Sequence, residues 1–519
     1  GRAREGFVIE TSDHAPPGDF EIKAIERVID KEPVFGAQTR ALADWISSLY
    51  LCSLGEALAL MIPGGKREME AEGAHTFHDE SEYRISSLNE EQTRVLAEIE
   101  STANPFFYLY GVTGSGKTLI FMHTAKRVFE QGKAVIYLVP EIALTHQVVN
   151  AFRSVFGAAV MDKELALLHS GLTASQRLTS WRRVARKEAR IVVGVRSAVF
   201  APVPNLGLIV IDEEHETSYK AGSTPRYHAR QVAMHRIREE GGLLLMGSAT
   251  PSLEAYAGMQ SGSLAWARLS SRAAGGRMPT VEVINLTREQ GPLSRRLIRE
   301  IAATKESGGQ TILFLNRRGF SHFFRCHSCG YEMKCARCSV SLTYHKNREL
   351  LICHYCGYKS KPATVCPSCR SLDVGFLGFG TERIEEDLRR LFPDYTVARI
   401  DTDTVKKKGT LQVVLKEFKE GRIDILLGTQ MVAKGLNVRN LRLVGVVLAD
   451  TGLMLPDFRA AERTFNLIVQ VGGRAGRFER EGLVLVQTYR PSHDAIRFAA
   501  RLEIDEYYER ELAVRKELS

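Results

Sequence analysis

Two stretches of the chain combine residue types that could bind and hydrolyse a nucleoside triphosphate. The first, GVTGSGKT, spans residues 111–118 between an apolar run and a helical pattern. Glycines in a G-x-x-x-x-G-K-T loop let backbone N–H groups surround phosphates, and the helix that follows points its positive end at them. We expect Lys117 to reach the β- and γ-phosphates and Thr118 to hold Mg²⁺. The predicted ATP-binding residues of this loop are Gly111, Val112, Thr113, Gly114, Ser115, Gly116, Lys117 and Thr118.

The second stretch, LGLIVIDEEH, places adjacent acids at the end of an apolar run. Such acids are unusual there because an unpaired buried charge is costly. We expect Asp212 to hold Mg²⁺ through water and Glu213 to orient or deprotonate the attacking water. A solvated acidic turn is the alternative, and the phosphate loop on the same predicted sheet argues against it.

Cysteine is concentrated in one segment, where eight of the nine residues form four C-x-x-C pairs. This spacing lets two thiolates meet one tetrahedral Zn²⁺, so four pairs predict two structural Cys₄ sites. We predict nested pairing, although sequential pairing fits the spacing too. Disulfides are disfavoured in a cytosolic context. The inner site would use Cys335, Cys338, Cys353 and Cys356, and the outer site Cys326, Cys329, Cys366 and Cys369.

The segment after the acids, HETSYKAGSTPRYHARQ, mixes aromatic and basic residues. Aromatic faces can stack on nucleic-acid bases while Arg and Lys meet phosphates. The alternative is an ordinary basic surface loop. The predicted DNA-coupling residues are Tyr219, Lys220, Arg226, Tyr227, His228 and Arg230.

Alternating apolar runs and helical segments predict an α/β protein with two parallel-sheet lobes that would position these residues. Predicted strands of the first lobe are FFYLYG, AVIYLVP, ARIVVGV, LGLIVID and GLLLMGSAT; those of the second are VEVINL, QTILFLN, VGFLGFGT, DILLGT, LVGVVLAD and GLVLVQTY. DFEIKAIERVIDKE and TRALADWISSLYLC predict two N-terminal helices. The predicted domains are residues 1–65, a linker at 66–87, lobe one at 88–274, lobe two at 275–325 with 370–519, and a Cys-rich insertion at 326–369.

Bulk properties narrow the class of protein. The 519 residues include 70 Lys and Arg and 61 Asp and Glu, which gives a formal net charge of +9. This positive charge is a mild indication of a polyanionic partner. No apolar run reaches the roughly 18 residues that cross a bilayer, and the first residues lack a signal core. We expect a soluble cytoplasmic protein. Because the chain starts without Met, we also expect a fragment of a longer protein.

The order GVTGSGKT, LVPEIALTHQ, DEEH, GSATPS, GTQMVAKG and QVGGRAGR resembles superfamily-two helicases with two RecA-like lobes. VGVRSAVFAP, DEEHETSYK, PRYHAR, GFGTERIEEDL, ADTGLMLPDFRAAERTF and the eight-Cys insert resemble, more closely, the PriA family of bacterial replication-restart helicases. The resemblance implies that Gln92, in LNEEQ, reads adenine. It also implies that Arg474 and Arg477 reach the γ-phosphate when the lobes close, where they would stabilise transition-state charge.

The resemblance further implies an ATP-dependent 3′–5′ DNA helicase that acts at stalled or branched forks and initiates primosome assembly. Its partners would be DNA, primosome proteins and single-strand-binding protein, and it would be monomeric. Residues 1–65 resemble a winged-helix domain, and we expect no sequence for the family's 3′-end-binding domain. The resemblance also supports the nested pairing of the cysteines, with two structural zincs.

This sequence departs from the family pattern at two places. Ala221 stands where the family usually has Gln, and residues 433–438 read AKGLNV rather than AKGHDF. Both departures bear on how DNA contact is coupled to hydrolysis. Two other functions stay open: an ATP-driven nucleic-acid translocase without productive unwinding, and a zinc-dependent partner-binding module with a degenerate ATPase. The second is disfavoured because the predicted catalytic residues Lys117, Asp212, Glu213, Arg474 and Arg477 are all present.

Overall fold

The computed structural model describes most of the chain. The described residues are 6–14, 24–30, 33–64, 87–273, 278–289, 291–315, 322–326, 328–338, 340–345, 348–377, 381–401, 410–429, 438–455, 457–475 and 482–518. The chain divides into two compact units, Gly1–Gly111 with Gly116–Leu269, and Val112–Ser115 with Ser270–Ser519. The predicted linker at 66–87 lies outside the described residues except for Ser87.

The first unit is built on a seven-stranded parallel sheet with the order β3-β4-β2-β5-β6-β1-β7. Its strands are β1 Phe106–Gly111, β2 Ala134–Leu138, β3 Leu165–Leu168, β4 Ile191–Gly194, β5 Leu206–Asp212, β6 Leu243–Ser248 and β7 Ala265–Leu269. All five strands predicted for this lobe are confirmed. Edge strands β3 and β7 were not predicted, because one is only a four-residue run and the other alternates buried and exposed positions.

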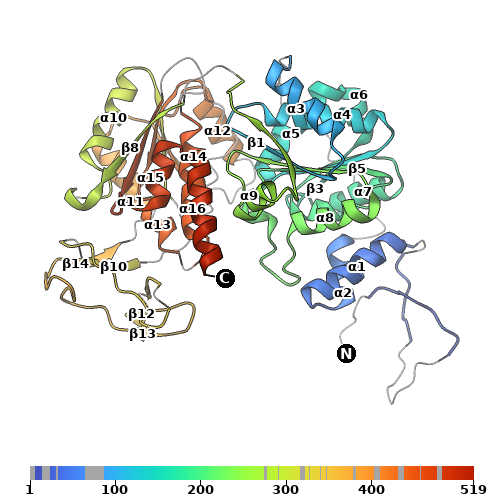
Figure 1. Cartoon of the computed structure of the whole chain (residues 1–519), viewed down its shortest axis with the longest axis horizontal. Helices are drawn as coiled ribbons and strands as arrows, with labels where there is room; N and C mark the ends of the chain where they lie inside the picture. The colour runs from blue at the N-terminus through green and yellow to red at the C-terminus, as the bar shows by residue number, and fades with distance from the viewer. Residues whose placement is uncertain are drawn as a thin grey trace. The chain divides into compact units, whose positions relative to one another are not determined.

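Helices cover both faces of this sheet, which explains why its central strands are continuous apolar runs. They are α3 Glu90–Ser101, α4 Lys117–Glu130, α5 Ile142–Phe156, α6 Ala158–Glu164, α7 Ala174–Ala185, α8 Ala229–Glu240 and α9 Leu253–Gln260, with the 3-10 turns η1 Arg196–Phe200 and η2 Thr217–Tyr219. Helices α3 to α6 lie on one face and α7 and α8 on the other (Figure 1). The loops at the carboxyl ends of β1 and β5 therefore share one edge of the sheet.

The second unit has a six-stranded parallel sheet with the order β15-β16-β9-β17-β18-β8. Its strands are β8 Thr280–Asn285, β9 Gln310–Phe314, β15 Val397–Ile400, β16 Ile425–Gly428, β17 Leu441–Val446 and β18 Leu483–Thr488. Its helices are α10 Arg295–Glu306, α11 Thr381–Leu391, α12 Thr410–Lys419, α13 Asp450–Leu453, α14 Ala460–Gly472, α15 Asp494–Arg501 and α16 Ile504–Glu517, with the turn η3 Leu286–Arg288. The predicted fold class is confirmed for both lobes.

The Cys-rich insertion forms its own five-stranded antiparallel sheet, with the order β13-β12-β11-β10-β14. Its strands are β10 His322–Cys326, β11 Thr343–His345, β12 Leu350–Ile352, β13 Lys359–Ser360 and β14 Val374–Leu377. The prediction that β14 belongs to the second lobe was wrong. A short apolar run indicates a strand but cannot say which sheet it joins, and here it pairs with β10.

The N-terminal residues form two helices, α1 Ala37–Tyr50 and α2 Leu54–Met61. Helix α1 confirms one prediction, and a Ser53–Glu56 capping box begins α2. The predicted helix at 19–32 was wrong, because its described residues 24–30 have no helical structure. The side chains of Ile25 and Val28 are 68% and 73% exposed. A helical pattern alone is insufficient, since most helical stability comes from burying the apolar face.

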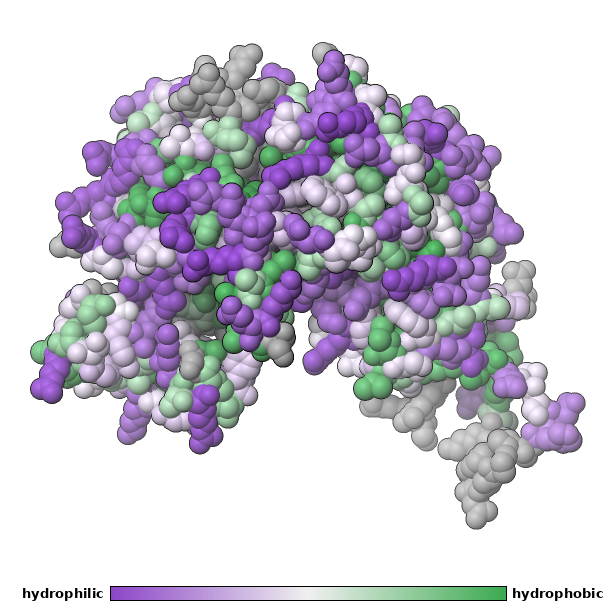
Figure 2. Space-filling view, in the orientation of Figure 1, coloured by the Kyte–Doolittle hydropathy of each residue, from purple (hydrophilic) through white to green (hydrophobic). Residues whose placement is uncertain are grey.

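Among the described residues, no helix is long and apolar enough to cross a membrane. Hydrophilic side chains predominate on the visible face of each unit (Figure 2).

Candidate nucleotide site and cysteine clusters

The phosphate loop connects β1 to α4, as its motif predicts. Gly114 and Gly116 have φ angles of 84° and 87°, a left-handed conformation that glycine adopts without strain. Helix α4 begins at Lys117, whose side chain is buried and donates a hydrogen bond from Nζ to the Gly111 carbonyl at 2.7 Å. Backbone donors and one lysine thus converge at the start of a helix, an arrangement that suits phosphate groups.

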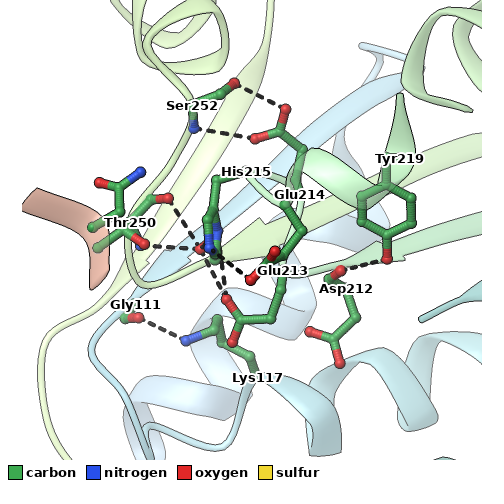
Figure 3. A network of polar contacts seen from close by, with 12 residues as sticks. Gly111, Lys117, Asp212, Glu213, Glu214, His215, Tyr219, Thr250 and Ser252 are labelled. Carbon is green, nitrogen blue, oxygen red and sulfur yellow. Dashed lines mark hydrogen bonds and ion pairs between the residues drawn. The ribbon is translucent and has the colours of Figure 1, made fainter. Parts of the chain in front are cut away.

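Asp212 ends β5, next to the phosphate loop (Figure 3). The Tyr137 hydroxyl donates to its carboxylate at 3.1 Å. Burial, followed by the charge of Glu213, raises the pKa of Asp212 to about 7, although Lys117 and Tyr137 act in the opposite direction. Two acids crowded beside one lysine can share a divalent cation, which would favour the ionised form of Asp212.

Glu213 is held in an unusual backbone conformation. Its φ is 49°, in the left-handed region that non-glycine residues rarely adopt, and such outliers concentrate at functional sites. The Ser248 hydroxyl donates to its carboxylate at 3.0 Å and lies 2.7 Å from His215 Nδ1. Burial alone would lower the pKa of His215, but Glu216, Glu213 and Glu214 together raise it.

The third acid of the run, Glu214, was missed from the sequence although it organises the site. It is 2% exposed and forms an ion pair with Arg230. The Tyr108 hydroxyl also donates to it at 3.2 Å, and Ser252 donates from its backbone N–H at 3.2 Å and its hydroxyl at 2.9 Å. Burial would raise the pKa of Glu214, but Arg230 and Ser252 hold it below its usual range. The only available signal was a third consecutive acid after a buried strand.

The loop after the acids does not expose its aromatic rings. Tyr219 is fully buried, and its hydroxyl donates to the Asp212 carbonyl at 2.6 Å. Tyr227 is 2% exposed and packs edge-on against Phe200. The prediction that these two rings stack on bases was therefore wrong for this structure. Composition shows which side chains a loop contains but not which of them fold inward.

The charged residues of this loop divide into two groups. Lys220 and Arg226 are exposed, whereas Arg230 turns inward to Glu214 and Ser252. Burial, with the nearby Arg230 charge, lowers the pKa of His228 to about 4, so the imidazole is neutral at physiological pH. The loop thus offers exposed cations at its surface and a buried ionic connection to the acidic turn.

Gln92 is 2% exposed near the start of α3. Its side-chain carbonyl accepts from the Asn89 N–H at 3.0 Å, and its own N–H donates to the Asn89 side chain at 2.8 Å. Asn89 and Gln92 thus form a capping box at the start of α3. Contact of Gln92 with adenine stays a prediction. Arg474 follows α14, while Arg477 and residues 433–437 lie outside the described residues.

The eight clustered cysteines gather into two groups of four, and the nested pairing is confirmed. In each C-x-x-C pair the first cysteine is buried and the second is more exposed. Three sulfur–sulfur distances, Cys326 to Cys369, Cys329 to Cys366 and Cys335 to Cys356, are each 3.6 Å. Zn–S bonds of about 2.3 Å at tetrahedral angles place sulfurs about 3.8 Å apart, so both clusters fit zinc.

Four family models match the chain. They are the 3′DNA-binding domain of PriA at residues 1–63, the DEAD/DEAH box helicase at 89–257, the PriA DNA helicase Cys-rich region at 335–361, and the helicase conserved C-terminal domain at 365–479. The first match contradicts our expectation that no 3′-end-binding sequence is present. It also assigns these residues to a domain other than the predicted winged helix. Two short amphipathic helices are too general a pattern to distinguish such domains.

Relatives cover nearly the whole chain. Replication restart protein PriA of Treponema pallidum (strain Nichols) is 48% identical, over 99% of this chain and 78% of its own length. The Bacillus subtilis (strain 168) protein of the same name is 46% identical, over 81% of this chain and 52% of its own. A crystal structure of the DUF1998 helicase MrfA bound to DNA has a TM-score of 0.51 and 16% identity, over 82% of this chain and 51% of its own, and shares the fold.

These matches agree with the order of motifs, the two parallel-sheet lobes and the paired cysteine clusters. The chain belongs to the PriA family of replication restart proteins, ATP-hydrolysing DNA helicases of superfamily two.

Proposed function

We propose that the chain is an ATP-dependent 3′–5′ DNA helicase that acts at stalled or branched replication forks and initiates primosome assembly. The observation that carries this proposal is the convergence of Lys117, Asp212 and Glu213 at one edge of a parallel sheet, joined through Glu214 to a loop with exposed cations. The names of the relatives support a role in replication restart, and the match at residues 1–63 supports contact with a DNA 3′ end.

In the proposed hydrolysis site, Lys117 neutralises charge on the β- and γ-phosphates, and Thr118 and Asp212 hold Mg²⁺. The bound ion would neutralise phosphate charge as it develops. Glu213 orients the attacking water through the carboxylate that Ser248 already fixes. Arg474 and Arg477 supply positive charge to the γ-phosphate when the two lobes close.

Coupling to DNA runs through the loop of residues 217–230. Exposed Lys220 and Arg226 contact phosphates, and Arg230 carries a change in loop position to Glu214. Because Glu214 also binds Ser252, the GSATPS segment moves with it. Ala221 departs from the family pattern, but it is buried and its N–H donates to the Tyr227 carbonyl at 2.8 Å, a bond that joins the two sides of the loop.

The two cysteine clusters hold two structural zincs. The core of their module is small and includes two of the ligands, Cys335 and Cys353, packed with Phe324, Leu342 and Leu351. Metal binding therefore supplies much of the module's folding energy. We propose that the module contacts primosome proteins and single-strand-binding protein and assists strand separation, and that the helicase works as a monomer in the cytoplasm.

The proposed function is tested by ATP turnover with and without single-stranded DNA, followed by strand displacement from forks with either a 3′ or a 5′ single-stranded tail. We expect DNA to stimulate ATP turnover strongly. We also expect strand displacement from the fork with a 3′ single-stranded tail and not from the fork with a 5′ tail. Stimulation without displacement would favour the translocase, and stimulation by RNA as strong as by DNA would contradict a DNA-specific motor. Absence of turnover would favour the partner-binding module.

Replacement of the phosphate-loop lysine tests the ATP site. Lys117→Ala should reduce turnover by at least about 100-fold, because charge on the phosphates would lose the cationic side chain of the phosphate loop. Lys126→Ala is the matched control, since this lysine lies on the same helix with a half-exposed side chain. Steady-state turnover measures both variants. Unchanged turnover in Lys117→Ala would refute the site assignment.

Mg²⁺ binding should depend on pH through Asp212. Its raised pKa, about 7, means that the metal-free site retains a proton at lower pH, and Mg²⁺ must displace it. Affinity for the Mg²⁺–nucleotide complex should be about ten-fold weaker at about pH 6 than at about pH 8, with protons released on binding. Calorimetry in buffers of different ionisation enthalpy measures this release. Asp212→Asn should retain only the nucleotide's own pH dependence, and identical profiles would contradict the expected role.

Removal of zinc should separate the module from the motor. Cys335→Ser or chelation should spare DNA-free ATP turnover but impair strand displacement, because the Cys-rich module forms a separate sheet. Cys52→Ser, outside the clusters, is the matched control. Metal analysis should find two zincs per chain, one for each cluster. Equal loss of turnover and displacement would show instead that the module is part of the motor core.

A further inference from the structure

Helix α1 ends at a tyrosine that contacts the loop joined to the ATP site. The Tyr50 hydroxyl donates to Gln231 Oε1 at 2.6 Å and accepts from the His228 backbone N–H at 3.2 Å. Lys220 Nζ lies 5.4 Å from the centre of the tyrosine ring. A single side chain of the N-terminal helices therefore contacts three groups of the loop and of α8.

A second side-chain contact joins α1 to α8. The rings of Trp45 and His235 are stacked, with centroids 4.0 Å apart and planes within 4°. Gln231 and His235 are four residues apart on α8, so they lie on one face of that helix. Trp45 and Tyr50 therefore both contact this one face of α8.

The loop is narrow where Tyr50 meets it. Lys220 and His228 are paired across its neck as an antiparallel bridge, and Tyr50 contacts both sides. Arg196 of η1 holds the neck further by donating to the Lys220 carbonyl at 2.7 Å. Two residues beyond His228, Arg230 enters the buried ion pair with Glu214.

We propose that Tyr50 is a positioning residue, which links the N-terminal helices to the hydrolysis site through His228, Arg230 and Glu214. This inference rests on the proposed function, in which DNA stimulates turnover. When the N-terminal segment binds DNA, a shift of α1 moves the loop neck. The Arg230–Glu214 ion pair then transmits this movement to Glu214, which is adjacent to Glu213. Burial of apolar residues such as Ile46 and Leu58 stabilises the N-terminal helices. The Tyr50 hydroxyl therefore contributes mainly to the position of the loop relative to α1.

The test is Tyr50→Phe in the whole chain, which removes both hydrogen bonds but keeps the ring beside Lys220. We expect unchanged KM for ATP and unchanged DNA-free turnover, with a melting temperature lowered by no more than a few degrees. The DNA-stimulated kcat should fall about five- to ten-fold, the effect of losing one or two well-placed hydrogen bonds. Gln231→Leu, at an exposed position on α8, should show a smaller effect of the same kind.

The double variant Tyr50→Phe with Gln231→Leu should equal Tyr50→Phe alone, because both changes remove the same bond. Tyr355→Phe, an equivalent change at an exposed tyrosine of the Cys-rich module, is the matched control. Full DNA stimulation in Tyr50→Phe would overturn the inference, and so would equal loss of DNA-free and stimulated turnover. If the unmodified chain showed no DNA stimulation, the proposed function would fail first, and the inference with it.

Discussion

The buried ion pair between Glu214 and Arg230 is the interaction on which the rest of the site depends. A carboxylate with 2% exposure is tolerable only when it is paired and hydrogen-bonded, and Arg230, Ser252 and Tyr108 meet that need. Loss of one partner from such a pair costs about 3–5 kcal/mol, since the other charge stays buried. The acidic turn, the basic loop and the GSATPS segment are therefore constrained to move together.

This constraint gives meaning to the strained backbone at Glu213. A left-handed conformation at a non-glycine residue persists only where its surroundings over-determine it. Here the neighbouring Glu214 is anchored from several sides, and Ser248 holds the Glu213 carboxylate. The parallel sheet supplies the frame, because it brings the ends of β1, β5 and β6 to one edge.

Features defined by local chemistry were predictable from the sequence. The phosphate loop, the strand before it and the four C-x-x-C pairs depend on residue types at short spacing, where backbone geometry leaves few alternatives. Which pairs share a metal was not decided by spacing, and the resemblance to the PriA family supported the nested arrangement. The central strands were equally clear because burial on both faces demands continuous apolar runs.

Features defined by long-range contacts were not predictable. The sequence around Glu214 does not indicate that Arg230 is its partner. The Tyr219 hydroxyl can be buried because the carbonyls of Leu138 and Asp212 accept its hydrogen bonds. The sheet that β14 joins is decided by its pairing with β10, which begins some fifty residues earlier. The N-terminal helices were misassigned because a two-helix pattern lacks the contacts that distinguish one small domain from another.

The pairing of β10 with β14 has a consequence for how such a chain could be assembled in evolution. The first and last strands of the Cys-rich module lie side by side, with Phe323 opposite Leu377, so the chain enters and leaves the module at neighbouring points. To the second lobe, the whole insertion is equivalent to a short surface connection, and insertions of this geometry impose little closure entropy on their host. A metal-stabilised insertion of this kind can be gained, exchanged or lost in evolution without a change in the strand order of the lobe that carries it.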